Sequence, residues 1–164
     1  MIDRLDLYED EDLCAIVIRA AKILNVRLEA EGASEVAGRS RGTPRIAIRL
    51  LSRARDYAET RADGIVSKSV AQDALELHEI DALGLDEMDR RLLTLMVDKF
   101  SGKPVGLNNI AAALGEEPDT IEDVYEPFLI QQGFLMRTSR GRQVTSRAYQ
   151  HLGMEPPQDQ MRLL

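Results

Sequence analysis

The sequence predicts a mainly α-helical protein in two parts: a bundle of four helices, then three helices followed by a β-hairpin. Up to Leu77, apolar residues recur at the spacing of amphipathic helices. Residues 79–85 show no sustained period and are interpreted as the connection between the two parts. After Gly133 the apolar period changes to two, which is typical of strands.

Charge and apolar spacing predict the first two helices. Acidic residues 9–12 suit a helix N-terminus, where negative charge is favoured. The apolar positions that follow at helical spacing are Leu13, Ile16, Val17, Ala20, Ile23 and Leu24. A shorter helix is expected over 31–39. Cys14 is the single cysteine, which excludes an internal disulfide and a cysteine-based zinc site, and it is expected to be a core residue.

The third helix is predicted to begin at Thr43, a good N-cap, with Pro44 in the first turn, where its fixed φ fits. Arg45 then lies at the positive end of the helix dipole, where free N–H groups attract anions. Residues 36–55 contain no Asp or Glu. The arginines in this stretch are Arg39, Arg41, Arg45, Arg49, Arg53 and Arg55. Such a helix start can hold a phosphate, although the same pattern also fits a solvated surface.

The other face of this third helix is apolar, so arginines and core residues separate by side. Its apolar positions are Ile46, Leu50, Leu51, Ala54, Tyr57 and Ala58. The dipeptide at 63–64 is expected to end the helix. Ser67 or Ser69 can cap a fourth helix, which completes the bundle.

The second part is predicted to begin at Asp86, which caps a helix that ends before Gly102 and Pro104. A short strand or turn at 105–107 follows. Asn108 is expected to cap a helix over 109–114. Thr120 is expected to open a third helix over 121–132, in which Pro127 should cause a kink or remove one hydrogen bond.

A hairpin is predicted from strands at 134–138 and 142–145 around a turn at 139–141, and the order of elements is that of a winged helix. The third helix of this part carries three carboxylates and no Lys or Arg, so insertion between DNA phosphates would meet repulsion. Residues 133–151 carry four arginines and no carboxylate: Arg137, Arg140, Arg142 and Arg147. The hairpin is therefore the expected DNA contact, and phosphate binding predicts indifference to base sequence.

Composition sets further limits. The 164 residues, 44% hydrophobic and 30% charged, fit an ordinary soluble protein of one or two small domains. No apolar run approaches the ~20 residues of a membrane span, and no secretory signal is visible, so a cytoplasmic address without a membrane partner is expected. The net charge of −7 does not exclude a local basic patch. His78 and His151 are isolated, so no metal site is expected, and no catalytic residues are expected in this chain alone.

Several motifs, in order along nearly the whole chain, resemble the RuvB family of AAA+ ATPases, motors of Holliday junction branch migration in recombination and DNA repair. The motif at 41–47 resembles the sensor-2 motif. The other matching stretches are 4–8, 109–117, 120–124 and 129–135. The sequence departs from the family at Ile48, where a polar residue is more common, and at Ser139, where proline commonly precedes the wing arginine.

The resemblance implies a domain organisation and a set of roles. It assigns 1–80 to an AAA+ small lid domain with sensor 2, 81–156 to a winged-helix DNA-binding head, and 157–164 to a tail. By the same resemblance, Tyr8 lies against the nucleotide and Arg45 reaches the ATP phosphates as sensor 2. Arg137 and Arg142 match wing arginines that contact the DNA backbone. Arg140 is a candidate by position alone.

The resemblance also implies ATP and Mg²⁺ in the full-length motor, a homohexamer, and RuvA and RuvC as partners beside Holliday junction DNA. The RuvA contact is expected on a large ATPase domain that would precede Met1. The sequence has no Gly-x-x-x-x-Gly-Lys-[Ser/Thr] loop, so this chain alone is expected neither to hydrolyse ATP nor to bind nucleotide stably. Two alternatives remain: a winged-helix transcription regulator or replication-initiator fragment, and a protein-interaction adaptor.

Overall fold

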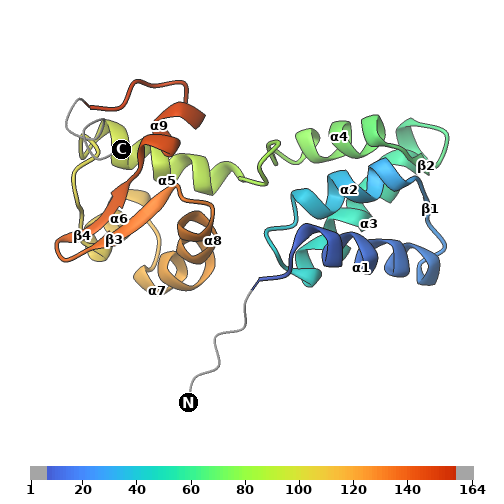
Figure 1. Ribbon diagram of the computed structural model, residues 1–164. Helices are drawn as coiled ribbons and strands as arrows, with labels where there is room; N and C mark the ends of the chain where they lie inside the picture. Colours follow the sequence, from blue (N-terminus) through green and yellow to red (C-terminus); the bar gives the residue numbers. More distant parts are fainter. Residues whose placement is uncertain (1–6, 158–164) are drawn as a thin grey trace, which may run out of the picture. The chain divides into compact units, whose positions relative to one another are not determined.

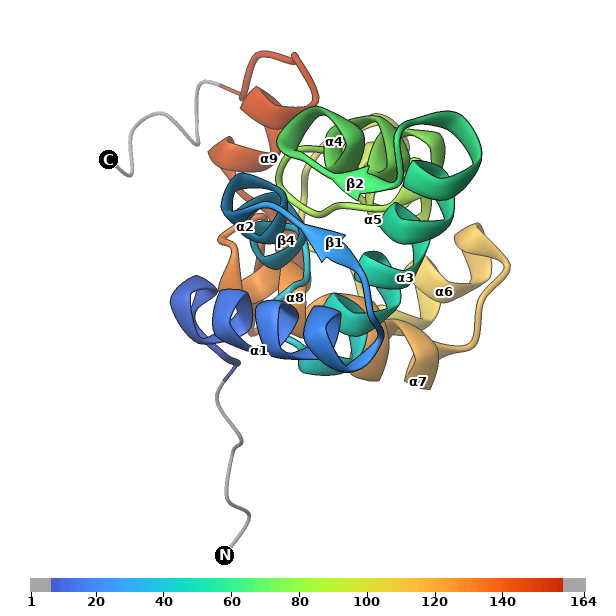
Figure 2. The same cartoon turned by 90° about the vertical axis from the view of Figure 1, so that its right-hand side faces the viewer.

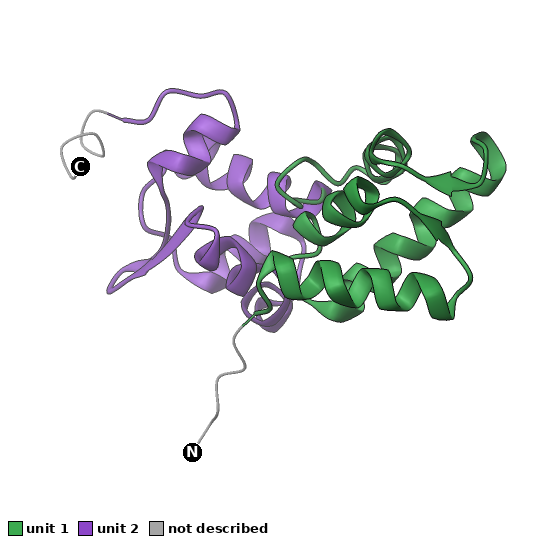
Figure 3. Ribbon diagram, turned by 45° about the vertical axis from the view of Figure 1, so that its right-hand side comes forward, with its two compact units in different colours: residues 1–86 green, residues 87–164 purple. Residues whose placement is uncertain are grey.

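The computed structural model describes residues 7–157 of the chain. By its contacts the chain divides into two units, residues 1–86 and 87–164 (Figure 3). The motif residues 4–6 and all of the expected tail except Pro157 lie outside the described residues.

The described part of unit 1 contains the four predicted helices (Figure 1). They are α1 (Asp10–Ile23), α2 (Ala30–Gly38), α3 (Pro44–Arg61) and α4 (Lys68–Leu77). The side chain of Ser67 caps α4 by accepting a hydrogen bond from the N–H of Val70 at 3.3 Å, one of the two caps that the sequence offered. The four helices are therefore confirmed, each within two residues of its expected start.

Two short strands in unit 1 were not predicted. They are β1 (Arg27–Leu28) and β2 (Ile65–Val66), which pair in parallel and lie side by side in Figures 1 and 2. Strands of two residues contain no period that a sequence pattern could reveal, and their partners are far apart in the chain.

The core of unit 1 comes from one face of each helix. Its largest fully buried side chains are Leu13, Leu50, Leu51 and Leu75, with alanines between them. The apolar face expected for the third helix is confirmed, whereas Ile23 is 75% exposed and Leu24 is 39% exposed. The buried stripe of α1 follows Leu13, Val17 and Ala21, and Ile23 is off that stripe, so periodicity predicted too wide a face.

Unit 2 has the predicted order of helix, short strand, helix, helix and hairpin. Its first two helices are α5 (Glu87–Asp98) and α6 (Leu107–Leu114). The third is divided into α7 (Pro118–Thr120), a π-helical turn η1 (Ile121–Tyr125) and α8 (Glu126–Gln131). The hairpin strands β3 (Leu135–Thr138) and β4 (Gly141–Val144) pair antiparallel. A further helix, α9 (Ser146–His151), follows and was not predicted.

Local details differ from the predicted boundaries. Gly106, not Asn108, holds the N-cap position of α6, because Val105 pairs with Arg142 of β4 and the helix begins as soon as the chain leaves this bridge. The third helix begins at Pro118 rather than after Thr120, with proline in its first turn. The π-helical turn comes directly before the turn that contains Pro127, whose ring and missing N–H disturb the regular helical ladder, as expected.

Gly141 fixes the hairpin turn. Its φ is +130°, and a Cβ atom there would lie 2.2 Å from the carbonyl oxygen of Val105. Only glycine fits this position, so the chain reverses at a defined place and carries Arg142 directly opposite Arg137.

Candidate nucleotide and nucleic-acid contacts

The start of α3 differs in one respect from the predicted N-cap. Thr43 holds the N-cap position and Pro44 the first turn, as expected, but no side chain caps the helix. The Thr43 hydroxyl donates instead to the carbonyl oxygen of Arg41 at 3.2 Å. The N–H groups at the start of α3 therefore have no side-chain partner within the described chain, which favours a negatively charged ligand there.

Tyr8 lies close to this helix start. Its backbone N–H donates to the carbonyl oxygen of Gly42 at 2.9 Å. Gly42 has a φ of +66°, and a Cβ atom there would lie 2.4 Å from the Cβ atom of Leu7. The close approach of these two segments requires glycine. Two predicted nucleotide contacts, Tyr8 and Arg45, thus come from segments that are joined by a hydrogen bond, and the Tyr8 side chain is half exposed.

The arginines around this helix start do different things. Arg39 is buried and donates to the carbonyl oxygen of Ile80, besides pairing with Glu35 at 3.2 Å. Arg41 donates to the carbonyl oxygen of Gly84 and also forms an ion pair with Asp86. These two arginines therefore hold the segment that follows α4 against the bundle.

The arginines within α3 itself are more accessible than Arg39 and Arg41. Arg55 pairs with Asp56, and the pKa of His78 is lowered first by burial and second by the nearby Arg53. Arg45 and Arg49 are exposed and form no ion pair or side-chain hydrogen bond with any described residue. Arg45 can therefore turn toward a ligand without breaking an internal contact.

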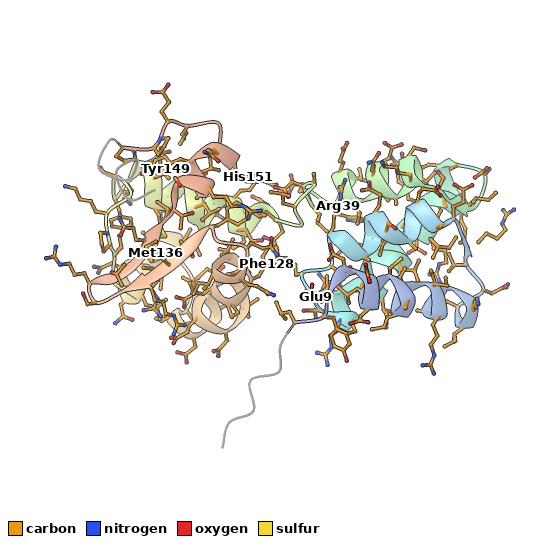
Figure 4. All side chains as sticks on the ribbon, in the orientation of Figure 1. Glu9, Arg39, Phe128, Met136, Tyr149 and His151 are labelled. Carbon is orange, nitrogen blue, oxygen red and sulfur yellow. The ribbon has the colours of Figure 1, made fainter. Side chains whose placement is uncertain are left out.

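Of the hairpin arginines, Arg142 is more enclosed than the sequence suggested: its side chain is 17% exposed, against 54% for Arg137. Arg137 and Arg142 are register partners, and strand alternation places them on the same face as the buried Leu135 and Val144. That face packs on the third helix, as the contacts between β3 and α8 indicate. In Figure 4 the labels of Met136 and Phe128 mark these two elements, β3 and α8.

Both arginines bind the carboxylate of Glu126. Arg137 donates from Nε at 2.9 Å, and Arg142 donates from Nε at 2.8 Å. Glu122, one helical turn earlier, accepts from the Nη2 groups of Arg137 at 3.3 Å and Arg142 at 3.0 Å. The carboxylates of the third helix were expected to repel DNA phosphates, and the direct pairing of Glu122 and Glu126 with the hairpin arginines was not predicted.

Burial and charge act in opposite directions on Glu126, which is fully buried. Burial alone would raise its pKa, but hydrogen bonds from Arg137 and Arg142 and their positive charge outweigh this effect and keep the pKa below its ordinary value. The Arg137 pKa is raised, mainly by its hydrogen bond to Glu126. Glu126 and Arg137 are thus both charged at neutral pH.

Two further arginines of this region are Arg140, in the hairpin turn, and Arg147, on α9. Arg140 is exposed in the turn, and its side chain has no partner among the described residues; only its backbone N–H is bonded, to Thr138 Oγ1 at 3.2 Å. Arg147 lies over the ring of Phe134 at 5.1 Å. Arg140, predicted by position alone, is therefore the hairpin arginine most available to an external phosphate.

No other candidate site emerges from the described residues. Within 7–157, no group of three His, Cys, Asp or Glu side chains could hold a metal ion, and no helix is long and apolar enough to cross a membrane. His151 packs against Phe134, with ring centres 5.3 Å apart. Cys14 is a free thiol, partly buried against the core.

The sequence matches two known domain families, one after the other. Residues 8–81 match the RuvB AAA lid domain, and residues 82–153 match the RuvB C-terminal winged helix domain. The chain belongs to the RuvB family. Its predicted fold class, a helical AAA+ lid bundle followed by a winged helix with a small β-hairpin, is thereby confirmed.

Individual RuvB proteins extend the comparison. The Holliday junction branch migration complex subunit RuvB of Parafrankia sp. (strain EAN1pec) is 56% identical over 157 residues, which cover 96% of this chain and 44% of that protein. The solved Thermotoga maritima RuvB Holliday junction branch migration motor is 48% identical, with a TM-score of 0.90 over 93% of this chain and 51% of that one. A variant of the same Thermotoga protein gives a TM-score of 0.91. The chain thus spans about half the length of these RuvB proteins.

Proposed function

We propose that this chain provides the lid and the DNA-binding head of a RuvB-type motor, which uses ATP to drive Holliday junction branch migration in recombination and repair. The observation that carries this proposal is the consecutive match of residues 8–153 to the two RuvB domains. The relatives named as branch migration proteins support the same assignment. The lid is assigned to 1–80, the head to 81–156 and the tail to 157–164.

In the lid, Tyr8 and Arg45 would contact ATP, which supplies the energy of the motor together with Mg²⁺. The residues fit this role: the start of α3 lacks a side-chain cap, Arg45 has no ion-pair partner among the described residues, and the Tyr8 segment is bonded to the same turn. A guanidinium group that hydrogen-bonds the terminal phosphate is released when the phosphate leaves. The rigid bundle would then turn with the state of the nucleotide.

In the head, the hairpin would bind the phosphates of duplex DNA without reading bases. Arg140 is exposed, Arg137 is half exposed, and Arg142 is largely covered. We therefore rank Arg140 and Arg137 above Arg142 as first contacts. The carboxylates of the third helix oppose its entry into a groove, which favours this mode over recognition of bases by a winged-helix regulator.

The proposed motor acts as a homohexamer with RuvA and RuvC at the junction. The RuvA contact is assigned to the ATPase domain of RuvB rather than to this chain. The proposed location is the cytoplasm.

The DNA-binding role is tested by titrating the full chain with two duplexes of equal length and unrelated sequence. We expect equal affinities, and for R140A a lower affinity for both duplexes, with a salt slope reduced by about 0.9 for each phosphate that the variant no longer neutralises. R19A is the control, since Arg19 is an exposed arginine of α1 in the other unit. Marked preference for one duplex would favour a sequence-specific regulator, and absence of binding would favour a protein-interaction adaptor.

A further inference from the structure

Glu126 holds both hairpin arginines with a single carboxylate. Besides the two Nε contacts to Oε1, the Nη2 groups of Arg137 and Arg142 donate to Oε2 at 3.0 and 3.2 Å. The side chain of Glu126 is only 1% exposed. This carboxylate cannot leave the arginines without opening the unit, so it fixes where the two guanidinium groups lie.

Glu122 makes a contact of a different kind with the same arginines. A single oxygen, Oε1, accepts from the Nη2 groups of Arg137 and Arg142. The Glu122 side chain is 40% exposed, so it can turn into solvent without disturbing the core. The arginines would then keep all their bonds to Glu126 and would have their Nη2 groups open to another acceptor.

Charge balance indicates what that acceptor would be. Two arginines and two glutamates make the cluster neutral, and departure of Glu122 leaves one uncompensated positive charge. A backbone phosphate carries one negative charge and accepts hydrogen bonds from guanidinium groups as a carboxylate does. Within the described chain, neither guanidinium donates from Nη1, so each arginine also has further donors for a phosphate.

We propose that Glu126 positions Arg137 and Arg142 for a phosphate of the DNA backbone, and that Glu122 occupies the place of this phosphate until DNA displaces it. The inference rests on the proposed function, because duplex DNA is the source of the phosphate. The two glutamates then have opposite effects on DNA binding. Glu126 holds the arginines in place for the phosphate, and Glu122 competes with the phosphate for the same arginines.

The test compares E122Q with D123N in duplex titrations of the full chain. Each substitution removes one negative charge from the same helix, but Asp123 is exposed and has no ion pair or side-chain hydrogen bond within the described residues. E122Q should tighten binding about threefold to tenfold, equivalent to about 0.7–1.4 kcal/mol. D123N should change it less than about twofold, because a distant exposed charge is screened by salt.

Two further variants separate the proposed roles. In a chain that also carries R137A and R142A, E122Q should have no more effect than D123N, because its partners are gone. E126Q should weaken binding and lower the salt slope, with an unchanged circular dichroism spectrum as the check of folding.

The outcomes distinguish the inference from the proposed function. Equal effects of E122Q and D123N, or weaker binding by E122Q, would overturn the inference and leave the proposed function standing if the wild-type chain binds DNA. If no variant binds duplex DNA, both fail. If E126Q does not fold, the comparison of E122Q with D123N still decides the role of Glu122.

Discussion

Two like charges face each other across the hairpin, and a buried carboxylate makes this arrangement stable. Arg137 and Arg142 are direct register partners, a placement that destabilises a strand pair when both charges are uncompensated. Glu126 accepts from both, and its own burial would be unfavourable without them. The three side chains therefore form one unit, in which each charge depends on the others.

We expect E126A to destabilise the winged-helix unit by about 3–5 kcal/mol, the usual effect of removing one partner from a buried ion pair. Urea unfolding measures this loss. E122A is the matched control, since Glu122 meets the same arginines but is partly exposed, and its effect should stay near or below about 1 kcal/mol. Equal effects of the two substitutions would show that the burial of Glu126 does not determine how much it contributes to stability.

Acid should weaken unit 2 through Glu126. Its pKa is lowered in the folded state by hydrogen bonds to Arg137 and Arg142, which outweigh the opposing effect of burial. This contribution to stability is therefore complete above the pKa of the unfolded chain, about 4.3, and is lost as the pH falls through the lower folded value. Urea unfolding from pH 7 to pH 3 should show a steeper loss for wild type than for E126Q. Parallel pH dependences for wild type and E126Q would contradict the assignment of this acid sensitivity to Glu126.

At the scale of elements, helices were easier to predict than short strands and ion pairs. The apolar face of α3 and the Pro127 disturbance follow from local spacing and backbone chemistry, which the sequence displays directly. The pairing of β1 with β2 and the burial of Glu126 depend on contacts between distant segments. Strand alternation places Arg137 and Arg142 on the inward face of the hairpin, together with Leu135. The prediction used only their positive charge, which indicated a contact with DNA.

Helix α3 separates a core face from an exposed start, and this separation can be tested. R45A should change the stability of the bundle by less than about 0.5 kcal/mol, because Arg45 is exposed and makes no described side-chain contact. L50A should cost about 2–5 kcal/mol, because Leu50 is fully buried. Thermal unfolding followed by circular dichroism compares the two. Loss of folding in R45A would assign Arg45 a structural role instead.

At the scale of the whole molecule, the chain carries proposed contacts for two ligands, a nucleotide and DNA. The proposed nucleotide site is incomplete within this chain. Tyr8 and Arg45 are proposed to form one side of a nucleotide site, and the sequence contains no phosphate-binding loop that could form the other. The chain spans about half the length of each RuvB relative.

We therefore expect the chain alone to show no ATP hydrolysis above buffer, to be monomeric by light scattering at micromolar concentration, and not to capture RuvA. A malachite-green phosphate assay checks the hydrolysis, and a pull-down with purified RuvA checks the capture. Steady hydrolysis that R45A abolishes, or a discrete six-fold assembly, would refute the proposed division between this chain and an ATPase domain.

The most direct test of the central claim joins this chain to the ATPase part of the RuvB of Parafrankia sp. (strain EAN1pec), its 56% identical relative. ATP-driven branch migration is then followed on a synthetic Holliday junction. We predict that the joined protein moves the junction, that R45A stops movement while DNA binding persists, and that R49A, a neighbouring exposed arginine of α3, has little effect. Undiminished migration by R45A, or no migration by a joined protein that folds and hydrolyses ATP, would contradict the assignment of this chain as the lid and DNA-binding head of the motor.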